Sequence, residues 1–245
     1  MHPYLAEFVG TALLLLLGNA VVCNVVLKHT KGHGSGWIVI TAGWGFAVFI
    51  AVASVAEHSG AHINPAVSIG LAIAGMFEWS LVPGYIAAQL AGAFVGTSFA
   101  FLAYHQHYHA TDDPALTLAT FSTAPAIRSA RWNLTTEAIG TVALVLPILL
   151  FSPPSVTVAE QAGEIGLGSL GAIPAGLLVF GIGLSLGGPT GYAINPARDL
   201  GPRIAHALLP VPGKGRSDWA YAWVPVAGPL VGAAIAGGAA LALAP

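Results

Sequence analysis

Charged side chains are scarce in this sequence, and cysteine is almost absent. Asp, Glu, Lys and Arg together make up 7% of the 245 residues, whereas 56% are hydrophobic and the mean hydropathy is +0.77. A water-soluble protein with this composition would expose too much apolar surface, so we expect the chain in a lipid bilayer. The single cysteine, Cys23, excludes an internal disulfide. A net charge of −2 gives no reason to expect nucleic acid as a partner.

Apolar runs of membrane-spanning length, about 20 residues, are abundant instead. Six of them cover residues 4–27, 37–56, 81–104, 134–151, 170–187 and 219–243. The fold class that they predict is an all-α membrane protein with six transmembrane helices.

Three motifs occur twice, in the same order in each half of the chain. They are Asn-Pro-Ala at 64–66 and 195–197, Glu-x-x-Gly-Thr at 7–11 and 137–141, and Ala-Gly-x-x-Val-Gly at 91–96 and 227–232. Because each half holds three spans, the second half must enter the membrane in the opposite orientation, as an inverted repeat. We therefore expect a single channel domain, 1–245, whose halves of about 1–110 and 130–245 are joined by a loop over about 105–131.

Each Asn-Pro pair predicts a helix start, because Asn is a favoured N-cap and Pro is favoured at the first helical position. The helices expected there, 65–75 and 196–209, are about half as long as a membrane span. Such half-helices are tolerated at membrane depth only where protein surrounds them or water lines them. The inverted symmetry places Asn64 and Asn195 face to face near the midplane, where their carboxamide N–H groups can donate to a passing solute.

Two opposed helix N-termini carry partial positive charge, so the centre of this path is expected to exclude protons and cations while neutral polar solutes pass. Non-helical residues precede each Asn, and their backbone carbonyls are expected to form two ladders of acceptors along the path. The ladders comprise Gly60, Ala61, His62, Gly191, Tyr192 and Ala193.

The paired motifs and the run 191–202 together resemble the aquaporin, or major intrinsic protein, family over almost the whole chain. Asp199 directly after Arg198, followed by Gly-Pro-Arg at 201–203, resembles the glycerol-facilitator branch. The resemblance implies six spanning helices with two re-entrant half-helices, assembled as a homotetramer with one pore per subunit. It implies a passive channel for glycerol, water and other small neutral solutes that excludes protons and ions, with no enzymatic activity, no cofactor and no metal.

The family's narrowest point is a constriction of aromatic residues and arginine. Its four positions fall on Trp44, Gly183, Tyr192 and Arg198. Water-selective relatives usually have His at the position of Gly183, so the glycine leaves room for Tyr192 to lean against Trp44 and form an apolar corner. Arg198 would face that corner with fixed N–H donors. The best-known glycerol channels have Phe where this chain has Tyr192, and the added hydroxyl would narrow or polarise the site.

Two carboxylates lie inside expected spans, Glu7 and Glu137, and could serve in a proton relay or as structural supports. The family pattern favours support, in which each accepts N–H groups of the neighbouring half-helix loop. For Asp199, the sequence leaves open a local pair with Arg203 at i+4 and a direct role in permeation.

Two alternatives to a glycerol channel stay open. The first is a channel for small organic acids in their neutral form, such as lactic acid, or for dihydroxyacetone. The second is an ion-coupled secondary transporter, which also uses inverted repeats and broken helices. Such a transporter needs a site for its coupling ion, and no intramembrane acidic pair beside a substrate site is evident in the sequence.

The distribution of basic residues and the family resemblance disagree about orientation. All eight Lys and Arg residues lie in connections on one side of the six-span topology. The positive-inside rule would make that side cytoplasmic. The resemblance instead implies a bacterial plasma-membrane protein with both termini in the cytoplasm, and we follow it because the family inserts uniformly.

Overall fold

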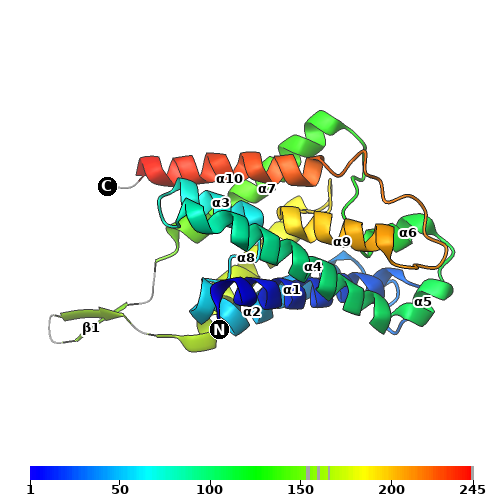
Figure 1. The fold of residues 1–245 in the computed structure, drawn as a ribbon, viewed down its shortest axis with the longest axis horizontal. Coiled ribbons are helices and arrows are strands. Elements are labelled where there is room, and N and C mark those ends of the chain that lie inside the picture. The colour runs from blue at the N-terminus through cyan, green and yellow to red at the C-terminus, as the bar shows by residue number, and fades with distance from the viewer. Residues whose placement is uncertain (153–154, 159–160, 165, 244–245) are drawn as a thin grey trace.

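The computed structural model of the chain describes residues 1–152, 155–158, 161–164 and 166–243. Within this part of the chain, six helices are long and apolar enough to cross a membrane, which confirms the predicted spans. They are α1 (Pro3–Val26), α2 (Trp37–Ser59), the 3-10 turn η1 (Trp79–Leu81) together with α4 (Val82–Ala103), α7 (Ala130–Leu150), the 3-10 turn η2 (Gly168–Ala172) together with α8 (Ile173–Leu186), and α10 (Val224–Leu243). The helices run side by side along the long axis of the molecule (Figure 1).

Two short helices follow the Asn-Pro pairs, α3 (Pro65–Ile73) and α9 (Pro196–Leu208). Both end slightly before the predicted boundaries; Gly75, with φ +72°, follows α3 in a left-handed conformation that only glycine adopts freely. Each half-helix packs against a spanning helix of the other half, α3 against α10 and α9 against α4. Figure 1 shows them entering from opposite ends of the helix bundle.

The connections differ at the two ends of the molecule. At one end lie two short helices, α5 (His105–His109) and α6 (Pro114–Ala119). At the other end lie both termini and an antiparallel hairpin of β1 (Ser155–Val158) and β2 (Gln161–Glu164), which projects from the bundle (Figure 1).

Paired glycines on α4 and α10 let these helices cross a neighbouring spanning helix at close range, and the pairs occupy equivalent positions in the two halves. On α4, Gly92 and Gly96 face the backbone of α1: a Cβ added at Gly96 would lie 2.1 Å from the Ala12 carbonyl oxygen. On α10, a Cβ at Gly232 would lie 2.4 Å from the Ala138 carbonyl oxygen of α7. Small residues at this spacing permit tight helix contacts in membranes. The crossings α1–α4 and α7–α10 thus fix the frame that holds the half-helices.

Gly96→Ala is expected to destabilise the protein by about 1–3 kcal/mol, because the new methyl group would overlap a backbone oxygen that cannot move alone. Thermal unfolding in detergent should show a lowered Tm. Gly238→Ala on α10 is the matched control, since no atom lies within 4 Å of its added Cβ. Equal Tm values for both variants would contradict the close crossing of α1 and α4.

Candidate solute pore

A cavity of about 850 Å³ runs through the centre of the bundle, past the starts of both half-helices. One side is apolar, with side chains from α1, α2, α7 and α8, including Leu14, Val48, Leu144 and Val179. The other side is formed by the non-helical segments before α3 and α9 and by Arg198. The path is therefore apolar along one wall and polar along the other.

The two Asn side chains cap their own helices and also link the two halves. The Asn64 Oδ1 atom accepts from the backbone N–H of Ala66 (2.8 Å), and Asn195 Oδ1 accepts from that of Ala197 (3.0 Å). Each Nδ2 then donates to the opposite loop: Asn64 to the Ile194 carbonyl and Asn195 to the Ile63 carbonyl, both at 2.9 Å. From the sequence we expected both N–H groups of each amide to be available to the solute. In the structure one N–H of each amide is engaged, and one remains for the path.

The loop before α3 is held in an uncommon backbone conformation by Glu7. Ala61 and Ile63 have φ of +51° and +44°, values that cost a non-glycine residue about 1–3 kcal/mol. The buried Glu7 carboxylate accepts from the backbone N–H groups of His62 (2.9 Å) and Ile63 (2.7 Å). It also accepts from Ser59 Oγ (2.6 Å) and from Gln89 Nε2 (2.7 Å). These four hydrogen bonds offset the strain and satisfy a carboxylate removed from water.

The loop before α9 repeats this arrangement in the second half. Tyr192 and Ile194 have φ of +39° and +43°. The buried Glu137 carboxylate accepts from the backbone N–H groups of Ala193 (3.1 Å) and Ile194 (2.8 Å). Neither Glu137 nor Glu7 lines the cavity, so both carboxylates face the backs of the loops.

The loop conformation leaves backbone carbonyls free beside the path. Five of the six residues expected in the acceptor ladders line the cavity, and Gly191 does not. In the part of the chain that the structure describes, none of the six carbonyls accepts a hydrogen bond from the protein. A hydroxyl-bearing solute can therefore donate to them without displacing a protein bond.

Three of the four expected constriction residues meet at one end of the cavity. Trp44, Tyr192 and Arg198 line it, and the Arg198 Cζ atom lies 4.2 Å from the Trp44 ring centroid. A guanidinium over an indole face at this distance is a favourable cation–π contact. One guanidinium N–H donates to the Phe121 carbonyl (3.3 Å), and no other acceptor contacts the guanidinium among the described residues. The remaining donors are available to a solute.

Glycines create the space for the two aromatic rings. A Cβ at Gly183 would lie 3.0 Å from Tyr192 Cζ and 2.9 Å from Thr41 Cγ2, so Gly183 makes room without itself lining the cavity. Gly18 on α1 is a second such position, which nothing in the sequence indicated: a Cβ there would lie 2.3 Å from the Trp44 ring. The shape of the constriction thus depends on residues that contribute no atom to its wall.

Comparisons with known proteins agree with this geometry. Residues 1–239 match the family described as major intrinsic protein. The chain belongs to the major intrinsic protein family. A probable glycerol uptake facilitator protein of Thermotoga maritima is 57% identical over 232 residues, which cover 95% of each chain. The D/L-lactic acid transporter of Lactiplantibacillus plantarum is 40% identical over 240 residues, covering 96% of this chain and 95% of the relative.

A solved structure extends the likeness to the fold. The X-ray structure of the aquaglyceroporin from Plasmodium falciparum matches with a TM-score of 0.75 at 32% identity. The match covers 96% of this chain and 93% of that one. Members of the major intrinsic protein family are channels, so the chain is not an enzyme.

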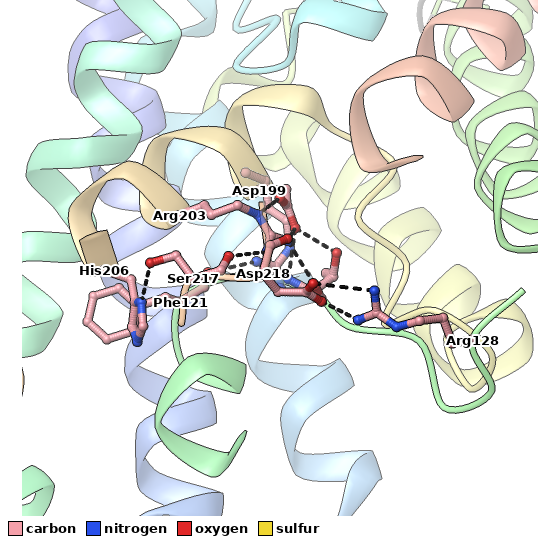
Figure 2. A network of polar contacts seen from close by, with 9 residues as sticks. Phe121, Arg128, Asp199, Arg203, His206, Ser217 and Asp218 are labelled. Atoms are coloured by element: carbon pink, nitrogen blue, oxygen red, sulfur yellow. Dashed lines mark hydrogen bonds and ion pairs between the residues drawn. The ribbon is translucent and has the colours of Figure 1, made fainter. Parts of the chain in front are cut away.

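Phe121 is a second position that the sequence analysis missed in this member of the family. It belongs to the connection after α6, and its carbonyl reaches Arg198 on α9. Its buried ring packs edge-on against His206, with centroids 5.1 Å apart (Figure 2). Any residue can offer a backbone carbonyl, so no side-chain type in the sequence could have indicated this contact.

The Tyr192 hydroxyl, which was expected to narrow or polarise the site, is buried in the structure. The oxygen is buried and has no hydrogen-bond partner among the described residues. The ring packs edge-on against Trp37, with centroids 5.8 Å apart. Tyr192 therefore presents ring carbon atoms, and not its hydroxyl, to the cavity.

Tyr192→Phe is expected to leave glycerol and water permeability within about twofold of the parent. The hydroxyl that this change removes is buried and makes no hydrogen bond, so neither the wall of the cavity nor a contact with the solute should change. Stopped-flow light scattering of proteoliposomes measures both permeabilities. A glycerol permeability reduced more than about fivefold, at equal protein content, would show that the hydroxyl contacts the solute.

Proposed function

We propose that this chain is a passive channel for glycerol and other small neutral solutes, that it also conducts water, and that it excludes protons and ions. The two-sided wall of the cavity carries this proposal. Glycerol has CH groups along one side of its carbon chain and hydroxyl groups that must stay hydrogen-bonded. The apolar wall accommodates the former, while Arg198, the Asn amides and the free carbonyls replace water for the latter.

The constriction selects solutes by shape as well as by hydrogen bonding. Trp44 and Tyr192 form the apolar corner, and Arg198 supplies donors opposite. A carbon chain fits against the rings with its hydroxyl groups toward the guanidinium. The permanent charge of Arg198 and the two helix N-termini at Asn64 and Asn195 make the dehydration of a cation unfavourable here.

Between glycerol and lactic acid, we propose glycerol as the principal solute. The relative named as a probable glycerol uptake facilitator is 57% identical to this chain over 232 residues, and the relative named as a D/L-lactic acid transporter is 40% identical over 240 residues. Lactic acid in its neutral form is a second candidate, because it is also a small three-carbon solute with a hydroxyl group, and its protonated carboxyl group carries no charge.

An ion-coupled transporter is disfavoured by the position of the carboxylates. A coupling ion needs acidic or carbonyl ligands that also contact the substrate path. Glu7 and Glu137 point away from the cavity, and Asp199 is paired with Arg203. The intramembrane acids of the described chain are therefore engaged in holding backbone.

We further propose that the functional unit is a homotetramer in a bacterial plasma membrane, with both termini in the cytoplasm. This orientation places α5, α6 and the basic connections outside the cell. Labelling of single cysteines introduced at His109 and at Glu78, in a Cys23→Ser background and from one side at a time, tests it.

The function is tested with purified protein in liposomes free of any ion gradient. Glycerol influx should rise in proportion to concentration without saturating, water should pass, and no ionic current should appear in planar bilayers. Lactic acid at low pH and urea are measured in the same vesicles to rank solutes. Influx that requires a proton or sodium gradient would establish a transporter and overturn the channel.

Gly183→His combined with Tyr192→Thr should lower glycerol permeability at least tenfold more than water permeability. The imidazole would occupy the volume now taken by the Tyr192 ring and would reduce the width that a carbon chain needs. The ratio of the two permeabilities reports this effect independently of protein yield. An unchanged ratio in correctly assembled protein would contradict the assigned constriction.

A further inference from the structure

A fully buried ion pair lies behind the constriction, on the face of α9 turned away from the path. The Arg203 Nε atom donates to Asp199 Oδ1 (2.8 Å) and Nη2 donates to Asp199 Oδ2 (2.9 Å), with both side chains 0% exposed. Of the two roles that the sequence left open for Asp199, the structure shows the local pair with Arg203 at i+4. Asp199 does not line the cavity.

This pair binds the connection that follows α6. Asp199 Oδ2 accepts from both the backbone N–H (2.8 Å) and the hydroxyl (2.7 Å) of Thr123, and Arg203 Nη2 donates to the Thr123 carbonyl (3.0 Å). Arg203 Nη1 donates to the carbonyls of Ser217 (2.7 Å) and Asp218 (3.2 Å). All five guanidinium donors are therefore used, and two connections are fastened to one helix (Figure 2).

Neighbouring residues of α9 hold the same segment at two points. Arg198, facing the path, donates to the Phe121 carbonyl, and Asp199, facing away, holds Thr123. Because Phe121 and Thr123 are two residues apart, the ion pair fixes the position of the one protein acceptor that contacts the Arg198 guanidinium in the described chain. That acceptor and the Trp44 ring together set where the guanidinium lies.

We propose that Asp199 and Arg203 are positioning residues for solute selection: they hold segment 121–123 so that the Phe121 carbonyl keeps the Arg198 guanidinium over Trp44. The proposal rests on the proposed channel function, since it assigns the selectivity of that pore. Without Asp199, the segment loses both bonds from Thr123, and Arg203 is left as a buried, unpaired charge. The Phe121 carbonyl then shifts, and the guanidinium samples positions that widen the constriction.

Asp199→Asn tests the idea, because it keeps the shape of the side chain and removes its charge. Permeabilities to water, glycerol and the four-carbon polyol erythritol are measured in proteoliposomes with equal amounts of folded protein. We expect the glycerol-to-erythritol permeability ratio to fall at least fivefold. A purely structural role would lower all permeabilities together and leave the ratio unchanged.

A double-mutant cycle decides whether Asp199 acts through Arg198. In an Arg198→Val background there is no guanidinium to position, so adding Asp199→Asn should change the ratio less than twofold. An equal change in both backgrounds would overturn the proposal, as would an unchanged ratio in the single variant. Asp112→Asn is the control for loss of an acidic side chain at the same end of the molecule, because its ion pair with Lys28 is exposed and does not contact segment 121–123.

Two further measurements test the proposal if the Asp199→Asn variant does not fold or if the parent channel conducts no glycerol. If Asp199→Asn does not fold, Thr123→Val removes one of the bonds to Asp199 and should shift the ratio in the same direction, by at least twofold. No shift in that folded variant would overturn the proposal. If the parent channel conducts no glycerol, the proposed function fails by itself, and the same cycle is completed with the water-to-proton permeability ratio.

Discussion

The reciprocal hydrogen bonds between Asn64 and Ile194 and between Asn195 and Ile63 are the constraint on which the centre of the channel depends. The oxygen of each Asn side chain accepts a hydrogen bond from its own helix, and one N–H of the amide donates to the opposite loop. The two helix starts are therefore held together by side chains that also face the path. Replacing either Asn by a residue without an amide would remove both the N-cap of its helix and one of the two hydrogen bonds that join the halves of the chain.

These hydrogen bonds require loops whose backbone carbonyls point both toward the opposite Asn and toward the path. The loops adopt this conformation through strained backbone angles that neighbouring side chains stabilise. Non-glycine residues with positive φ occur at equivalent places before both half-helices. The carboxylates of Glu7 and Glu137 hold these loops from behind. A buried carboxylate and a strained loop are each unfavourable alone, and together they satisfy one another. The free carbonyls along the path follow from this pairing.

Helix α9 connects the centre of the channel with its outer connections. Its start is capped by Asn195, which also bonds the loop before α3; Arg198 lies over the Trp44 ring, and the pair of Asp199 with Arg203 holds segment 121–123. One helix thereby carries Arg198, which lines the cavity, and the buried pair of Asp199 with Arg203, which does not. The contacts by which this pair holds segment 121–123 therefore lie outside the cavity lining, on residues that the path does not touch.

The sequence by itself determined the features that local spacing encodes. Runs of apolar residues set the six spans, and the Asn-Pro pairs set the starts of α3 and α9. The contacts that depend on long-range packing were decided only by the tertiary structure. Gly18 gives room to Trp44 because α1 crosses α2 there, and Phe121 meets Arg198 because an irregular connection folds back over α9. A backbone carbonyl or a missing side chain has no residue type that identifies its partner, so the fold alone reveals it.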